Sequence, residues 1–358
     1  MSSLPPGGKP PGPPYASPNA ITGGIPTTKV DVPISAILLA FFVGSATLNM
    51  TIFQINRRRG HKFLFSAMLF GFSFTRVIAL VMRIVWANYP TNTSIALAAQ
   101  IFVAAGVLLL FVVNLIFTQR IVRSYHPHFG WNKTVSLIWK GTLWSVLGLL
   151  VMVIVANVHS QFTLDLATRL RERDVLRFAA VYLAVMSFLP IPIVITAVLW
   201  PRSKEVTVTA GNIEKFGRGR MRTKVRLVLF ASTLLALGAS FRAGTSFLPR
   251  PAGDPAWYHS RAAFYCFNFV IELVVVYTYA ISRFDRRFHI PNGAHGAGSY
   301  AGAVKDEEDV FGSGEEGRED KGEQPDLEAH LPNGTTLAGS EHGSVEKETI
   351  EEKAVSAV

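Results

Sequence analysis

Apolar residues of this chain are gathered into seven long blocks separated by short polar segments. Each block has about 20 to 25 residues, the length that an α-helix needs to cross the ~30 Å hydrocarbon core of a bilayer. Inside lipid, backbone N–H and C=O groups must find partners within their own segment, which favours helices. The pattern predicts an all-α, polytopic membrane protein, a bundle of seven transmembrane helices at residues 33–55, 63–87, 95–118, 135–157, 176–200, 225–248 and 262–282.

Lysine and arginine residues predict how these helices cross the bilayer. Four of them follow the first block within residues 57–62, and seven lie between the fifth and sixth blocks within residues 201–224. The segment at residues 88–94, on the opposite side, has none. Because Lys and Arg concentrate in the cytosolic loops of membrane proteins, the N-terminus is predicted outside and the C-terminus in the cytosol.

The two ends of the chain differ from its body in composition and charge. Residues 1–32 are rich in Pro and Gly, which predicts a disordered extracellular tail. The body up to residue 283 holds 28 of the 35 Lys and Arg and 8 of the 25 Asp and Glu, so residues 284–358 hold 7 and 17. This acidic segment is predicted to be a disordered cytosolic tail, because residues 290–358 are rich in Gly, Glu, Asp and Ser and nearly devoid of aromatic residues. The net charge of +10 therefore follows membrane topology, and no nucleic-acid partner is predicted.

Four charged residues inside the predicted helices stand out, because a charge near the helix centre costs roughly 2.5–3.5 kcal/mol unless it has a partner or a wet cavity. Arg76 and Arg83 are seven residues apart and share a face of the second helix, while Arg242 lies in the sixth and Glu272 in the seventh. At 1.5 Å per residue, the depths of Glu272 and Arg76 differ by only ~5 Å. We expect Glu272 to pair with Arg76, with Arg242 as the competing partner.

This pair has two interpretations, an ion pair that fixes helix packing or a ligand-binding or switching site. Arg83, near the outer end of its helix, either snorkels to the surface or meets an anionic ligand. Asn268 adds an amide to the seventh helix, where such groups commonly hydrogen-bond between helices. The candidate intramembrane site is Arg76, Arg83, Arg242, Asn268 and Glu272.

Two features outside the helices are candidates for contact or modification. Residues 217–224 form the densest cationic run of the chain, with Arg218, Arg220, Arg222 and Lys224. These residues either set topology and attract anionic lipid, or they form a docking surface for a cytosolic partner. The sequon that begins at Asn92 lies on the predicted outer side and is a candidate glycosylation site.

Sequence motifs of catalysis and metal binding are missing. Cys266 is the single cysteine, which excludes an intrachain disulfide and a metal site built on several thiolates. The sequence has no Gly-rich nucleotide loop, no His-Glu-x-x-His zinc motif and no Gly-x-Ser-x-Gly elbow. We therefore expect no enzyme activity, no cofactor and no metal.

A resemblance to known membrane proteins rests on three stretches near the second predicted helix: His61-Lys62-Phe63, the run from Phe70 to Arg76, and the run from Arg83 to Ala87. They resemble a family of filamentous-fungal membrane proteins often labelled family-C-like G-protein-coupled receptor proteins. The resemblance covers residues 34–283 and implies seven helices with the N-terminus outside. The chain departs from rhodopsin-like receptors, because Thr118-Gln119-Arg120 stands where they carry Asp-Arg-Tyr. True family-C receptors carry a large extracellular ligand-binding domain, and the 32 Pro-rich residues before the first predicted helix are not expected to form one.

The expected function is therefore that of a seven-transmembrane receptor-like protein, in the plasma membrane or alternatively an endomembrane. Its expected partners are the lipid bilayer, an unknown small ligand and a heterotrimeric G protein. One alternative is a transporter or lipid-translocating protein, and another is a scaffold that recruits partners through its acidic tail. A cavity open only outward would favour the receptor, a cavity open to both faces or to lipid would favour transport, and a solid core would favour the scaffold.

Overall fold

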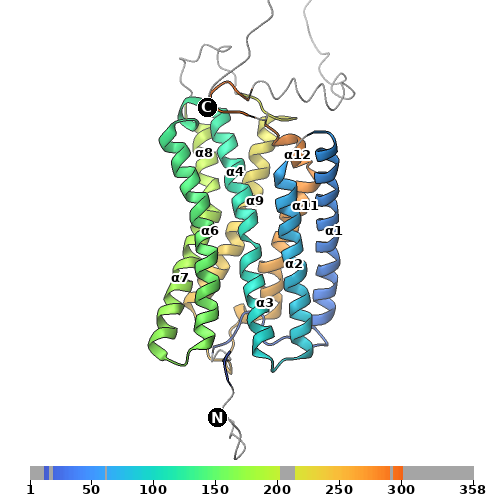
Figure 1. Ribbon diagram of the computed structural model, residues 1–358, viewed down its shortest axis with the longest axis vertical. Helices are drawn as coiled ribbons and strands as arrows, with labels where there is room; N and C mark the ends of the chain where they lie inside the picture. The colour runs from blue at the N-terminus through green and yellow to red at the C-terminus, as the bar shows by residue number, and fades with distance from the viewer. Residues whose placement is uncertain (1–11, 16–18, 61–62, 202–213, 291–292, 301–358) are drawn as a thin grey trace, which may run out of the picture. The chain divides into compact units, whose positions relative to one another are not determined.

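Seven helices of the described chain are long and apolar enough to cross a membrane (Figure 1). The computed structural model describes residues 12–15, 19–60, 63–201, 214–290 and 293–300. Within these ranges no strand is formed, and Asn19 and Pro251 make an isolated β-bridge. The predicted all-α bundle of seven membrane helices is confirmed, and the protein is an integral membrane protein.

Four spans are unbroken helices and three are interrupted. The unbroken spans are α1 (Asp31–Arg58), α2 (Leu64–Asn88), α6 (Lys133–Phe162) and α9 (Met221–Phe247). The third span consists of α3 (Thr93–Gly106) and α4 (Leu108–Tyr125), and the fifth of α7 (Leu166–Phe188) and α8 (Pro190–Leu199). The seventh consists of α10 (Arg261–Tyr265), the π-helical turn η2 (Cys266–Val270) and α11 (Ile271–Ile281). Short helices are α5 (Pro127–Gly130), the 3₁₀ turn η1 (Trp257–His259) and α12 (Phe284–Arg287).

Each interruption has a local cause. Pro190 lacks a backbone N–H, so the fifth span breaks there and α8 begins with this proline. At Gly106 an added Cβ would lie 3.1 Å from Cζ of Arg76, so the missing side chain gives that guanidinium room beside the third span. The π-helical turn η2 widens the seventh span just before Glu272, and such turns are frequent at functional sites.

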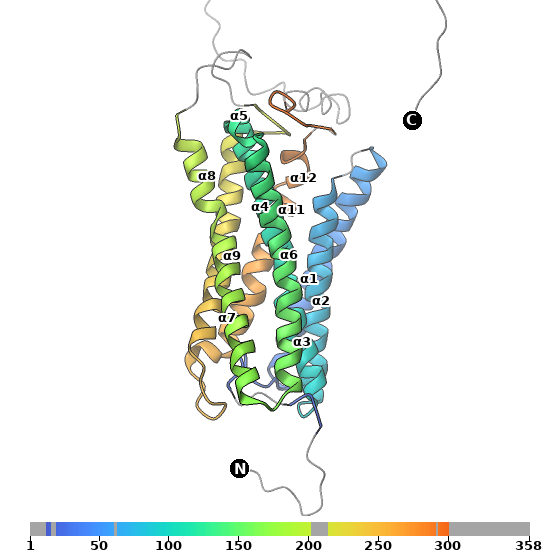
Figure 2. The same cartoon turned by 60° about the vertical axis from the view of Figure 1, so that its left-hand side comes forward.

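Residues 19–30 and residues 293–300 lie at opposite ends of the helices, as an odd number of spans requires (Figures 1 and 2). The end with residues 19–30 also carries the α2–α3, α6–α7 and α9–α10 connections. We call it the outer end and the opposite one the inner end, following the predicted orientation.

The spans differ in how much of their surface the protein covers. The third span packs against the second, fourth, fifth and sixth spans. Within its 18-residue apolar segment, 56% of the residues are buried. In the 18-residue apolar segment of α6 only 17% of the residues are buried, because this helix lies at the periphery. Large apolar side chains along the outside of α6 and α7 are exposed, as a lipid-facing surface requires: Leu137, Trp144, Val151, Val155 and Phe178.

Three predicted helices begin or end well inside the observed ones, and one of these is the third span, which was predicted to end at 118 and continues to Tyr125. The fifth span was predicted at 176–200, but α7 begins at Leu166, ten residues earlier. Asp165 accepts hydrogen bonds from the amides of Ala167 and Thr168, at 3.3 and 3.0 Å, and caps the added turns. The Thr168 hydroxyl and these amides hold the pKa of Asp165 below its ordinary value. The fourth span extends to Phe162 where 157 was predicted, so α6 and α7 continue as helices past the apolar block.

Parts of both predicted disordered tails are ordered in the structure, which corrects the tail boundaries at 32 and 284. Asp31 begins α1, and the backbone of Gly23 and Gly24 is held by Arg83. Phe284, Phe288 and Tyr300 are fully buried. These aromatic side chains bury apolar area, which the average composition of a 75-residue tail hides. Residues 1–11, 16–18, 291–292 and 301–358 of the predicted tails lie outside the described residues.

Candidate functional site

The candidate intramembrane residues fall into two clusters along α2. In the central cluster, Glu272 on α11 accepts two hydrogen bonds from Arg76 on α2, Nε to Oε2 at 2.6 Å and Nη2 to Oε1 at 2.8 Å. Arg242 on α9 donates to Oε1 of Glu272 at 3.4 Å and to Oδ1 of Asn268 at 3.3 Å. The structure thus places Arg76 against Glu272, as their depths predict. Arg242 shares the same carboxylate and does not compete for it.

Arg76 is held by the surrounding backbone and rings as well as by Glu272. Its Nη1 donates to the carbonyl of Val103 at 2.7 Å, three residues before the break in the third span. Its guanidinium lies 5.6 Å from the ring centroid of Phe72 and 5.5 Å from that of Phe269, within the range of cation–π attraction. Arg76 is therefore fixed between the second, third and seventh spans.

The central cluster has an excess of positive charge. Two guanidinium groups, Arg76 and Arg242, face the one carboxylate of Glu272. Arg76 is fully buried, whereas the side chain of Arg242 keeps 25% of its surface exposed. Charge inside a membrane is costly, and the excess of positive charge makes this cluster attractive to a negatively charged group.

The outer cluster, formed by Asp31, Arg83, Arg261 and Tyr265, lies two helical turns further out along α2. Oδ1 of Asp31 accepts hydrogen bonds from Nη2 of Arg83 at 3.0 Å and from the Tyr265 hydroxyl at 2.9 Å. Oδ2 of Asp31 lies 3.0 Å from Nε of Arg261. Arg83 is buried against Asp31 and donates to the carbonyl of Gly23 at 2.7 Å. The snorkelling predicted as one role of Arg83 is therefore wrong, because its guanidinium is turned inward by an acid that sequence reasoning missed.

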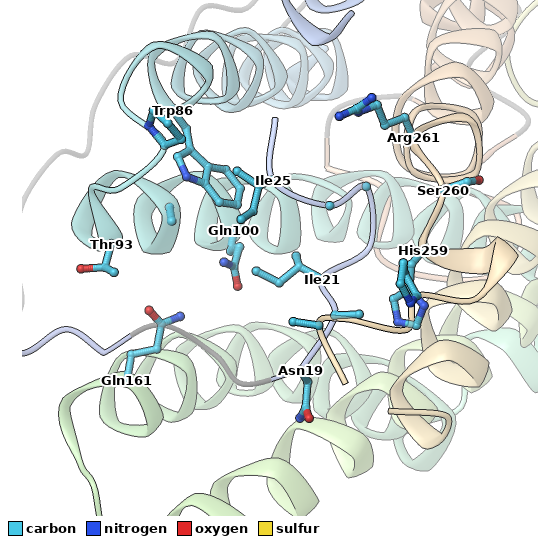
Figure 3. Close-up of a pocket in the computed structure, with 17 residues that line it drawn as sticks. Asn19, Ile21, Ile25, Trp86, Thr93, Gln100, Gln161, His259, Ser260 and Arg261 are labelled. Atoms are coloured by element: carbon cyan, nitrogen blue, oxygen red, sulfur yellow. The ribbon is translucent and has the colours of Figure 1, made fainter. Parts of the chain in front are cut away.

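An outer cavity of about 450 Å³ opens beside the outer cluster, between the ends of α2, α3 and α6 and the loop before α10. Residues 19–25 cross it, and their Gly23 amide donates to the His259 carbonyl at 2.9 Å. Figure 3 shows the indole of Trp86 and the amides of Gln100 and Gln161 directed into this space. Burial lowers the pKa of His259 in the cavity wall below its ordinary 6.5, so its imidazole is neutral at neutral pH.

The inner end of the bundle is closed by an inner seal, which consists of Phe216, Phe284, Phe288 and Tyr300. Phe288 stacks on Phe117 of α4 with ring centroids 4.1 Å apart, and Phe216 lies 5.5 Å from Tyr300. The backbone is tied as well, because the Arg218 amide donates to the carbonyl of Arg286 at 2.9 Å. Further donors to the seal backbone are Arg120 to the carbonyl of Phe288, Ser124 to that of Glu214 and Lys224 to that of Phe216.

The four predicted partner-contact residues are divided by the structure. Arg220 and Arg222 are exposed and Arg218 is half-buried at the inner end. Lys224 is fully buried, with its ammonium on the carbonyls of Phe216 and Gly217, the latter at 3.1 Å. The prediction of Lys224 as a partner contact is therefore wrong. Lys224 lies in the first turn of α9, and its flexible side chain folds back onto the carbonyls of the preceding turn. Counting charges along the sequence cannot predict such a contact.

Asn92 lies at the outer end, is exposed, and forms the N-cap of α3. Its Oδ1 accepts hydrogen bonds from the amides of Ser94 at 3.0 Å and Ile95 at 3.2 Å. Glycosylation at Asn92 stays a prediction.

Comparison with known protein families gives a match over part of the chain. A family model described as "Protein of unknown function (DUF3112)" matches residues 217–289. The match begins at Gly217 in the inner end, covers α9 and the seventh span, and ends at His289. It therefore contains Arg242, Asn268 and Glu272 of the central cluster. No curated protein and no solved structure matches the chain.

Proposed function

We propose that this integral membrane protein is a seven-transmembrane, receptor-like protein. A ligand in the outer cavity shifts α9 and α11 through the central cluster, and this movement releases the inner seal for a cytosolic partner. The role is non-enzymatic, and the plasma membrane is its proposed location, with an endomembrane as the alternative.

The observation that carries this proposal is the path of α9 and α11 between the two ends. α9 starts beside the inner seal and passes Arg242 in the central cluster before the chain reaches His259 in the cavity wall. The seventh span returns through Arg261 and Glu272 to Phe284 in the seal. These two neighbouring spans and the loop that joins them thus contact the cavity, the central cluster and the seal, which supports coupling between the ends.

The packing favours this proposal over a transporter with a path through the bundle. The described core at the inner end is filled by rings that pack on one another, with Phe117 6.1 Å from Phe284 and 5.7 Å from Tyr279. A close-packed interior transmits a displacement from one helix to the next.

The proposed partner is a heterotrimeric G protein, in line with the resemblance to family-C-like G-protein-coupled receptor proteins of filamentous fungi. The exposed guanidinium groups of Arg220 and Arg222 at the inner end support an acidic docking surface on that partner.

Capture of G-protein α-subunits by the solubilised full-length protein tests this function. Nucleotide is removed so that a coupled complex is stable, and the control variant has Arg218, Arg220 and Arg222 replaced by Gln. Lys224 is left unchanged, because its buried ammonium holds the inner seal. Binding that is lost in the control and reversed by GTP is expected. Absence of binding by folded protein would exclude coupling to the subunits tested.

A second candidate function, lipid translocation, is favoured by an apolar groove on the outside of the bundle. It lies between α1 and α10, has a volume of about 510 Å³ and is lined by Ile34, Ile37, Tyr265 and Cys266 among others. Fluorescent phospholipid in reconstituted vesicles distinguishes the two functions. Loss of leaflet asymmetry caused by the protein would favour translocation. The third alternative, a scaffold acting through the acidic tail, concerns residues outside those described.

A further inference from the structure

Two buried polar groups in the wall of the outer cavity have no hydrogen-bond partner among the described residues. Trp86 is 3% exposed and its Nε1 has no hydrogen-bond partner, and His259 is 7% exposed and its Nδ1 has none. Both side chains line the cavity. A buried donor without a partner costs free energy that a bound acceptor recovers. The indole N–H of Trp86 can only donate and therefore points to a ligand with a hydrogen-bond acceptor, and Nδ1 of His259 can donate to the same ligand in its Nδ1–H tautomer.

The charge around the cavity favours a negative ligand. Arg261 lines the cavity, and 38% of its side-chain surface is exposed. It forms an ion pair with Asp31, which is also paired with Arg83. The outer cluster thus places two guanidinium groups on one carboxylate. Among the described residues that line the cavity none carries a carboxylate, and the nearby Asp254 is paired with Arg250 at 3.0 Å.

The rest of the lining is suited to a small apolar body. Ile21 and Ile25 from the N-terminal segment face the cavity together with the Trp86 indole (Figure 3). A volume of about 450 Å³ lies within the range of small-molecule sites, which are mostly apolar with a few placed polar groups.

We infer that the outer cavity binds a small amphipathic anion, a carboxylate with a compact apolar body. The carboxylate accepts hydrogen bonds from Nε1 of Trp86 and from His259 and lies toward Arg261, while the apolar body packs on the face of the Trp86 ring and on the two isoleucines. This assignment of a ligand class rests on the proposed receptor function. Binding is measured without any G protein, so that either conclusion can fail while the other stands.

The test uses matched acid and amide probes on the full-length protein in phosphatidylcholine nanodiscs. The probes are 3-phenylpropionate and 3-phenylpropionamide, which have the same body and differ in charge, with binding measured by calorimetry. We expect the acid to bind at least tenfold more tightly than the amide. Oleate, supplied from the bilayer, is a second acid. Binding of 3-phenylpropionate supports the inference, whereas binding of oleate alone would contradict the compact apolar body and identify an acid drawn from the bilayer.

Three variants locate the binding site. Trp86→Phe keeps the ring and removes the Nε1 donor, so acid affinity should fall about two- to tenfold, the value of one hydrogen bond. Arg261→Gln should remove the preference for acid over amide. Trp200→Phe, an exposed tryptophan at the end of α8, is the matched control and should bind like the unaltered protein. Equal binding of acid and amide, no binding of either acid by folded protein, or an unchanged affinity in Trp86→Phe would each overturn the inference.

Discussion

In the central cluster, the carboxylate of Glu272 is shared by two guanidinium groups, and the geometry of the two contacts is unequal. Arg76 makes a bidentate contact at 2.6 and 2.8 Å from a fully buried position, whereas Arg242 lies at 3.4 Å and is partly exposed. Glu272→Gln leaves both arginines without a counter-charge and should cost about 3–5 kcal/mol of stability. Arg242→Gln removes one long hydrogen bond and should cost only about 1–2 kcal/mol.

Unfolding of both variants by titration with sodium dodecyl sulfate in mixed micelles measures these costs. The double variant Glu272→Gln, Arg242→Gln provides the control, because contacting residues couple in a mutant cycle. Equal costs for the two single variants, or a milder effect of Glu272→Gln, would contradict the unequal contacts.

His259 should give the protein a dependence on pH, because burial lowers the pKa of its imidazole below 6.5. Just below 6.5 the unfolded chain then binds more protons than the folded chain, so the free energy of unfolding rises with pH through this window. Well above 6.5, where the imidazole is deprotonated in both the folded and the unfolded chain, this contribution no longer changes. Melting temperatures between pH 5 and pH 8 should therefore rise with pH, and His259→Gln should flatten that rise. An identical pH profile in the variant would contradict this role.

At the residue scale, the sequence predicted the contact of Glu272 with Arg76 because depth in a membrane follows from residue number. It did not predict Asp31, whose position at a helix start is an ordinary place for an acid. The tertiary fold brings Asp31 to Arg83, Arg261 and Tyr265, and their spacing along the sequence gives no sign of it.

At the element scale, the inner seal depends on a close contact between α12 and the segment just before α9, at Gly217. Gly217 has φ +55°, and a Cβ added there would lie 2.4 Å from the carbonyl oxygen of Arg287. Gly217→Ala should therefore displace α12 and increase hydrogen exchange of the amides from Phe284 to Phe288. Gly141→Ala on α6, where an added Cβ meets nothing within 4 Å, is the matched control and should leave exchange unchanged. Equal exchange in both variants would contradict the close contact.

The positions of the spans could be predicted because hydropathy is local, but their ends could not. The first turns of α7 contain Arg169, Arg171 and Arg173, which read as a polar loop although they are good helix formers. The interruption at Pro190 follows from proline chemistry alone. The inner seal escaped prediction because Phe284 and Phe288 are interspersed with arginines.

At the scale of the whole molecule, the excess of Lys and Arg at the inner end predicts that this end faces the cytosol. An epitope tag at the N-terminus should be accessible to antibody on intact cells, and a tag at the C-terminus only after permeabilisation. The Asn92→Gln variant reports independently, because it should abolish any shift in mass on endoglycosidase treatment. The reverse tag pattern would contradict the orientation and, with it, the proposed outside ligand.

The central claim is that the central cluster controls the inner seal, and thiol labelling tests it most directly. With Cys266→Ser removing the native thiol, Ser124→Cys reports on the seal, because this buried hydroxyl donates to the carbonyl of Glu214. Ser232→Cys, buried within α9, reports on general unfolding. Adding Glu272→Gln or the milder Arg242→Gln should speed labelling of position 124 by a water-soluble maleimide at least tenfold and leave position 232 protected. Unchanged labelling at 124 in folded protein, or an equal increase at both positions, would contradict the account.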